Sequence, residues 1–184
     1  MSDGTFKMRE WQCYQDGLHD FCKYINSHSS CNIKSLVEVG SYMGEGTCIF
    51  RKGFPNAVIR CIDPWEAGFD EGDATSYSNF KNVENKFDQN ISEFKHIIKY
   101  KGTSSDFISY PEFRKVHVVY IDGCHTYDAV KNDIQTWLPR AKIAIGGHDF
   151  GANLDRLKGA ERAVKEVVGE PDMVFQDSSW VKML

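Results

Sequence analysis

The sequence has no apolar run that approaches the roughly 20 residues of a membrane-spanning helix. Its first residues, MSDGTFKMRE, lack the apolar core of a signal peptide. Basic residues are not in excess either, because the formal net charge is −4 and the pI about 5.9. We therefore expect a cytoplasmic protein whose partners include neither a membrane nor a nucleic acid held by a basic face.

The six cysteines contain no C-x-x-C pair, so the usual spacing of a zinc cluster is missing and reduced thiols are expected. Internal repeats, low-complexity tracts and linkers are missing as well. Residues 1–184 are therefore expected to form a single domain, long enough to bury a sizeable core. Within it, residues 1–34 carry a helical apolar pattern over about Trp11–Asn26 and are expected to act as a cap.

The most informative segment is LVEVGSYMGEGT, residues 36–47. An apolar run that ends in an acid and a glycine cluster is typical of a buried parallel strand that leads into a tight turn and a helix. Open α/β sheets bind nucleotides at such a turn. A dinucleotide fingerprint needs glycine where Tyr42 stands. The predicted cofactor-binding residues of this turn are Glu38, Gly40, Ser41, Tyr42 and Gly44.

A second strand over Ala57–Ile62 ends at Asp63-Pro64-Trp65. An acid at the tip of the second strand can accept hydrogen bonds from both ribose hydroxyls of a bound nucleotide. The alternative for Asp63 is a turn or helix N-cap aspartate. Pro64 ends the strand, and Trp65 either covers the adenine or closes the core.

A third short strand, Ile97–Tyr100, leads to Ser104 and Ser105, which either contact the adenine or cap a helix over residues 106–110. The other expected elements are helices within Phe80–Phe94, a strand over Val116–Ile121 that ends at Asp122-Gly123, a helix over Thr126–Leu138, a strand over Ala141–Ile145, a helix over Leu157–Val168, and extended pieces Met173–Phe175 and Trp180–Leu184. The short link between the last two pieces cannot house a crossover helix, so they must pair antiparallel. The fold class is therefore α/β: a Rossmann-like doubly wound sheet, mostly parallel, with a C-terminal antiparallel hairpin strand.

Four motifs together resemble class I S-adenosylmethionine-dependent methyltransferases of the methyltransferase-24 type. They are E-V-G-S-x-x-G-E-G-T, I-D-P-W, Y-I-D-G-x-H-x-Y-x-x-V-x-x-D and G-G-H-D-F. Macrocin-type O-methyltransferases and cephalosporin hydroxylase-like proteins are related branches. The resemblance implies that S-adenosylmethionine binds at the turns named above and at Asp122 and Gly123. It also implies methyl transfer to a hydroxyl or amine of a small molecule, for example a sugar or secondary metabolite.

The strand tips also carry candidate catalytic residues, namely His125, His148 and Asp122. Imidazole titrates near neutral pH and suits a general base. Macrocin-type relatives hold a divalent metal at positions that match Asp122 and Asp149, with His148 replacing a further acid of some relatives. Imidazole suits Mn²⁺ better than Mg²⁺, so either metal is an option and neither is required. Cys124 is interpreted as a packing residue.

The loop over residues 66–78 is polar and is expected, with the N-terminal helix, to set the selectivity for substrate. Its acids either attract a cationic or hydroxyl-rich substrate or form a solvated loop, and we favour the second; they are Glu66, Asp70, Glu71 and Asp73. Two other functions stay open. One is a non-transferring relative that binds the cofactor but hydroxylates or regulates, and the other is an NAD-dependent oxidoreductase. The sequence does not fix the methyl acceptor or the oligomeric state, a homodimer included.

Overall fold

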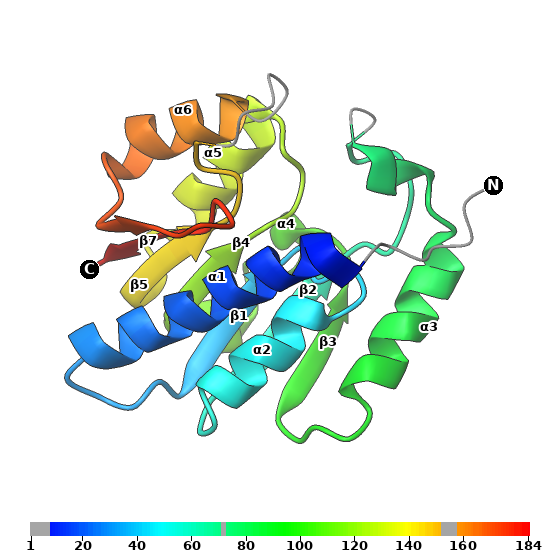
Figure 1. The fold of residues 1–184 in the computed structure, drawn as a ribbon, viewed down its shortest axis with the longest axis horizontal. Coiled ribbons are helices and arrows are strands. Elements are labelled where there is room, and N and C mark those ends of the chain that lie inside the picture. The colour runs from blue at the N-terminus through cyan, green and yellow to red at the C-terminus, as the bar shows by residue number, and fades with distance from the viewer. Residues whose placement is uncertain (1–7, 71–72, 152–157) are drawn as a thin grey trace.

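The computed structural model describes residues 8–70, 73–151 and 158–184. Strands of this part of the chain form one seven-stranded sheet in the order β3-β2-β1-β4-β5-β7-β6 (Figure 1). The strands are β1 (Ser35–Val39), β2 (Val58–Asp63), β3 (Ile97–Lys101), β4 (Val116–Ile121), β5 (Ala141–Gly147), β6 (Met173–Val174) and β7 (Trp180–Met183).

The first five strands are parallel, and β7 runs antiparallel to both β5 and β6. This arrangement confirms the expected mostly parallel sheet with a C-terminal antiparallel strand. In the register of β5 and β7, Gly147 pairs with Trp180. Since neighbouring parallel strands end at the same edge, the tips of β1, β2, β4 and β5 lie side by side.

Helices cover both faces of the sheet (Figure 1). One face carries α1 (Met8–His28), α2 (Glu45–Gly53) and α3 (Phe80–Ile91), and the other carries α4 (Ser104–Phe107), α5 (Tyr127–Trp137) and α6 (Lys158–Val168). Two short 3₁₀ turns, η1 (Ala74–Tyr77) and η2 (Pro111–Phe113), lie in the connections. None of the helices in the described ranges has the length and apolar character of a membrane span.

The core has two layers, one on each side of the sheet. On the first face, Phe21 of α1 is fully buried and packs against Tyr120 of β4 with ring centroids 5.2 Å apart. On the second face, Trp137 of α5 is fully buried beside Phe113, at 5.6 Å between centroids. Helix α1 thus forms a layer of the fold, in contact with α2 and β7.

Several element boundaries differ by a few residues from those expected, and two of these differences have a clear structural reason. The helix after β3 begins at Ser104 rather than at residue 106, because Thr103 and Asp106 form a reciprocal capping box at its start. Strand β5 continues through Gly146 and Gly147 rather than ending at Ile145. A Cβ atom on Gly147 would lie 2.3 Å from the carbonyl oxygen of Ile121, so glycine permits the close strand pairing here.

Candidate functional site

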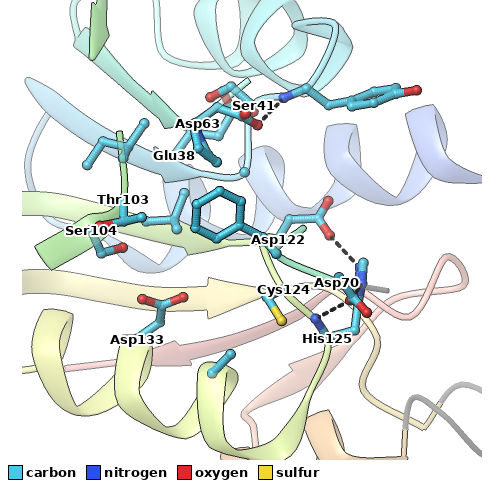
Figure 2. A pocket seen from close by; sticks show the side chains of 18 of the residues that line it. Glu38, Ser41, Asp63, Asp70, Thr103, Ser104, Asp122, Cys124, His125 and Asp133 are labelled. Atoms are coloured by element: carbon cyan, nitrogen blue, oxygen red, sulfur yellow. Dashed lines mark hydrogen bonds and ion pairs between the residues drawn. The ribbon is translucent and has the colours of Figure 1, made fainter. Parts of the chain in front are cut away.

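A cavity of about 580 Å³ lies at the carboxyl ends of the parallel strands. Its walls come from the segments that follow β1 to β5, including the long loop after β2. Figure 2 shows side chains from these separate segments converging on the cavity. The described side chains of α1 do not take part in this lining. The position matches the crevice in which open α/β sheets bind their ligands.

The turn after β1 approaches the turn after β4 so closely that only glycine fits at its start. Gly40 has a φ of +86°, and its N–H donates to the carbonyl oxygen of Ile62 at 2.8 Å. A Cβ atom at this position would lie 1.9 Å from the carbonyl oxygen of Asp122. Gly44, with a φ of +84°, is the N-cap of α2. The backbone geometry therefore explains both glycines, and Gly40 faces the cavity.

Glu38 is buried at the base of this turn and lines the cavity. Its Oε2 accepts hydrogen bonds from Ser41 Oγ, at 2.8 Å, and from Thr47 Oγ1. Burial raises the pKa of Glu38 to about 7, although these hydrogen bonds favour the charged form. Glu38 thus holds the turn in shape, and Ser41 and Tyr42 also line the cavity.

Asp63 joins the turns after β1 and β2. Its Oδ2 accepts the backbone N–H of Tyr42 at 2.9 Å, and its Oδ1 accepts that of Trp65 at 2.7 Å. Burial raises the pKa of Asp63, against the effect of these two hydrogen bonds. Asp63 and Pro64 both line the cavity. The turn role considered for Asp63 is therefore present, and the carboxylate also faces the space where a ligand would lie.

Trp65 does not line the cavity. Its ring is buried against Phe87, with centroids 4.8 Å apart, and its indole N–H donates to the carbonyl oxygen of Tyr42 at 2.7 Å. Of the two roles expected for Trp65, the structure places it in the core.

The residues that follow β3 bring hydroxyl groups to the cavity, which is lined here by Thr103, Ser104 and Ser105. Ser104 Oγ accepts the indole N–H of Trp137 at 3.2 Å. Asp133 of α5 lines the same wall, and burial raises its pKa to about 6. Figure 2 shows Asp133 near Ser104. The sequence motif includes Asp133, but its position in the cavity was not anticipated.

Asp122, His148 and Asp149 meet at the tips of β4 and β5, with one ligand atom of each within 4.8 Å of the others. His148 Nδ1 lies 3.0 Å from Asp149 Oδ1 and 3.9 Å from Asp122 Oδ1. Burial opposes the charge on His148, but the two carboxylates outweigh it and raise its pKa to about 9. His148 is therefore protonated at neutral pH in the metal-free protein. It can act as a base or a metal ligand only after it loses that proton.

His125 bridges two acids from different segments. Its backbone N–H and its Nδ1 lie 2.8 and 2.7 Å from Asp70 Oδ2, and its Nε2 lies 3.1 Å from Asp149 Oδ2. Burial opposes protonation, but Asp149, Asp122 and Asp70 together raise the pKa of His125. The contact with Asp70 fixes the loop after β2 against the tip of β4, as Figure 2 shows.

The loop acids are less solvated than expected. The side chains of Asp70 and Asp73 are 15% and 10% exposed, and both line the cavity, so the solvated interpretation is wrong for these two. The reason is the pairing of Asp70 with His125, which no local pattern reveals. Glu66 is exposed at the cavity, and Glu71 lies outside the described residues. Cys124 and Gly123 also line the cavity, with Cys124 Sγ 3.5 Å from Thr126 Oγ1.

Comparison with known proteins gives one family and many similar structures. Residues 37–150 match a family model described as a methyltransferase domain. An O-methyltransferase from Bacillus cereus in complex with SAH is 13% identical, with a TM-score of 0.59 over 91% of this chain and 78% of that one. The O-methyltransferase of tomaymycin synthesis from Streptomyces achromogenes, in complex with SAM, is 10% identical, with a TM-score of 0.59 over 91% and 77%. At these identities the likeness shows the fold alone. No curated protein sequence matches.

Proposed function

Because this chain belongs to the methyltransferase domain family of the methyltransferase-24 type, we propose that it transfers the methyl group of S-adenosylmethionine to a hydroxyl or amine of a small molecule. The observation that carries the proposal is the single cavity that joins the glycine turn and Asp63 to the cluster of Asp122, His148 and Asp149. Its volume is typical of a site for small molecules. The cofactor supplies a methyl group on a positively charged sulfur.

The residues present fit such a cofactor. Gly40 lets the turn after β1 pack against the backbone of Asp122, and both residues line the cavity in which the cofactor would lie. Asp63 would accept hydrogen bonds from the ribose hydroxyls while it holds the backbone N–H of Tyr42. Glu38 and the N-terminal end of α2 would hold the methionine part. Ser104 and Ser105 at the tip of β3 would contact the adenine.

The opposite end of the cavity would position the methyl acceptor and take up its proton. Asp122, His125 and His148 surround this end, and alignment of the acceptor atom with the methyl group supplies most of the rate. Asp122, His148 and Asp149 also offer two carboxylates and one imidazole to a divalent ion. This donor set suits Mn²⁺ better than Mg²⁺. A metal, if used, would be held by these three residues and would polarise the acceptor.

The first test is calorimetric titration of the protein with S-adenosylmethionine, S-adenosylhomocysteine and NAD. We expect both adenosyl compounds to bind and NAD not to bind. In Asp63→Ala, their affinity should fall about ten- to a hundredfold, since a hydrogen-bonded charged group is lost. Glu66→Gln, which removes an exposed charge from the rim, should change it little.

Asp63 also accepts two backbone hydrogen bonds, so thermal unfolding of each variant must accompany the titration. Absence of adenosyl binding by a folded wild-type protein would overturn the proposal, and preferential binding of NAD would favour the oxidoreductase. A relative that binds the cofactor without transferring its methyl group would give the same heats of binding. Release of S-adenosylhomocysteine in the presence of an acceptor separates that case from a methyltransferase.

A further inference from the structure

The cavity is lined by nine acidic residues, and its described lining contains no lysine and no arginine. Several of these acids have evident tasks near the cofactor end, such as the turn contacts of Glu38 and Asp63. The acids at the other end of the cavity line the space where a substrate would lie. Any ligand bound there must be electrostatically compatible with the negative charge of this wall.

Four carboxylates gather at the acceptor end, on Asp70, Asp73, Asp122 and Asp149, and only two imidazoles accompany them. Even with both imidazoles protonated, the cluster keeps a surplus of two negative charges. A divalent ion held by Asp122, His148 and Asp149 requires neutral His148, so a surplus of one negative charge remains. The sulfonium of the cofactor would offset one charge of the metal-free surplus, and again one would remain. Only with the ion and the sulfonium bound together would the cluster be neutral, so the preference for a cation is strongest in the metal-free protein.

This surplus lies in a poorly solvated place. The side chains of Asp73 and Asp149 are 10% and 9% exposed, and those of Asp70 and Asp122 are 15% and 16% exposed. Water screens charges weakly at such sites, so an anion brought into contact would meet strong repulsion. Phe69 lines the cavity next to Asp70 and is 49% exposed, which provides an aromatic face of the kind that attracts organic cations.

We propose that the methyl acceptor of this enzyme carries a positive charge: it is a small hydroxyl compound with a separate ammonium group that faces this wall. The hydroxyl oxygen takes the methyl group from sulfur, its proton passes to a carboxylate of the cluster, and S-adenosylhomocysteine leaves. Carboxylates, phosphorylated sugars and acyl-coenzyme A esters are correspondingly excluded as acceptors. The inference rests on the proposed function, because it concerns the acceptor end of the same cavity. It names a class of substrate that the shared fold does not determine, since the charge comes from the loop after β2 as well as from the strand tips.

The test uses three catechols of similar shape that differ in charge: 3,4-dihydroxyphenethylamine, 4-methylcatechol and 3,4-dihydroxyphenylacetate. Each is titrated calorimetrically into protein saturated with S-adenosylhomocysteine, once with EDTA and once with Mn²⁺. We expect the ammonium compound to bind about a hundredfold more tightly than the carboxylate at low salt, with the neutral compound between them. The ratio should shrink as salt is added.

Asp73→Asn should reduce the ratio about tenfold, because it removes one charge of the wall without changing its shape. Glu93→Gln makes the same charge change at an exposed site that does not line the cavity, and should leave the ratio unchanged. The inference is overturned if the carboxylate binds as tightly as the ammonium compound, if the ammonium compound does not bind at millimolar concentration, or if Asp73→Asn leaves the ratio intact. Failure of S-adenosylhomocysteine to bind at all would instead overturn the proposed function.

Discussion

The two ends of the cavity are built in different ways. At the cofactor end, the chain conformation sets the geometry: Gly40 presses against the backbone of Asp122, and Asp63 holds two backbone N–H groups. At the acceptor end, side chains from distant segments set it, since Asp70 contacts His125 across 55 positions. A backbone-built wall tolerates few substitutions, whereas a wall of paired side chains can change its specificity while the fold is kept.

The largest effect is expected from Gly40→Ala, which should lower the free energy of unfolding by about 3–5 kcal/mol. The new Cβ atom would lie 1.9 Å from the carbonyl oxygen of Asp122, so two strand tips would have to separate. Gly68→Ala is the matched control. Gly68 also has a positive φ, of +96°, but nothing lies within 4 Å of its Cβ position.

Gly68→Ala should therefore cost only about 1 kcal/mol, the penalty for a left-handed backbone. Urea unfolding at a fixed pH measures both variants. Equal losses in the two variants would show that backbone strain alone matters and that the close contact of the two turns does not.

Titratable groups at the two ends should also change the stability of the protein in different pH ranges. The pKa of Glu38 is raised from 4.5 to about 7, so the folded protein binds more protons and stability is lost as pH rises between these values. The pKa of His148 is raised from 6.5 to about 9, so the stability that this group contributes is lost as pH rises between those two values. Each of these two pKa shifts corresponds to at most about 3–4 kcal/mol.

As pH rises from 4.5 to 7, the free energy of unfolding of Glu38→Gln should increase relative to that of wild type. His148→Gln should be less stable than wild type below pH 6.5, and that deficit should disappear as pH rises to about 9. Unfolding in urea with EDTA, at a series of pH values, gives both differences. If the two variants differ from wild type in the same pH window, the two ends are not electrostatically distinct.

The smallest effect concerns the pairing of His125 with the loop. Asp70→Asn should lower the pKa of His125, because a carboxylate 2.7 Å from Nδ1 is neutralised. Asp73→Asn should lower it less, since that oxygen lies 3.9 Å away. Titration of the imidazole C–H signals by NMR in EDTA measures both shifts. An equal or larger shift in Asp73→Asn would mean that Asp70 does not hold this histidine in solution.

The sequence predicts which residues meet at the strand tips, because these residues follow strands with a clear apolar pattern. Parallel strands end at one edge, which brings together Asp122, His148 and Asp149 as expected. The pairing of Asp70 with His125 was not predictable, because the loop has no periodicity that fixes where it returns. Asp133 had one usable signal: it lies between Val130 and Ile134, both buried, on the face of α5 that turns toward the sheet.

The place of β7 in the sheet has a consequence for biosynthesis. Gly147 and Trp180 are neighbours in the sheet but far apart in sequence, so β5 leaves the ribosome well before the strand that pairs with its outer edge. Until residues 180–183 emerge, an inner strand of the finished protein is an edge with unpaired backbone groups, able to pair with a second nascent chain. The rate at which the hairpin of residues 173–183 is delivered therefore decides how long each new molecule is exposed to aggregation.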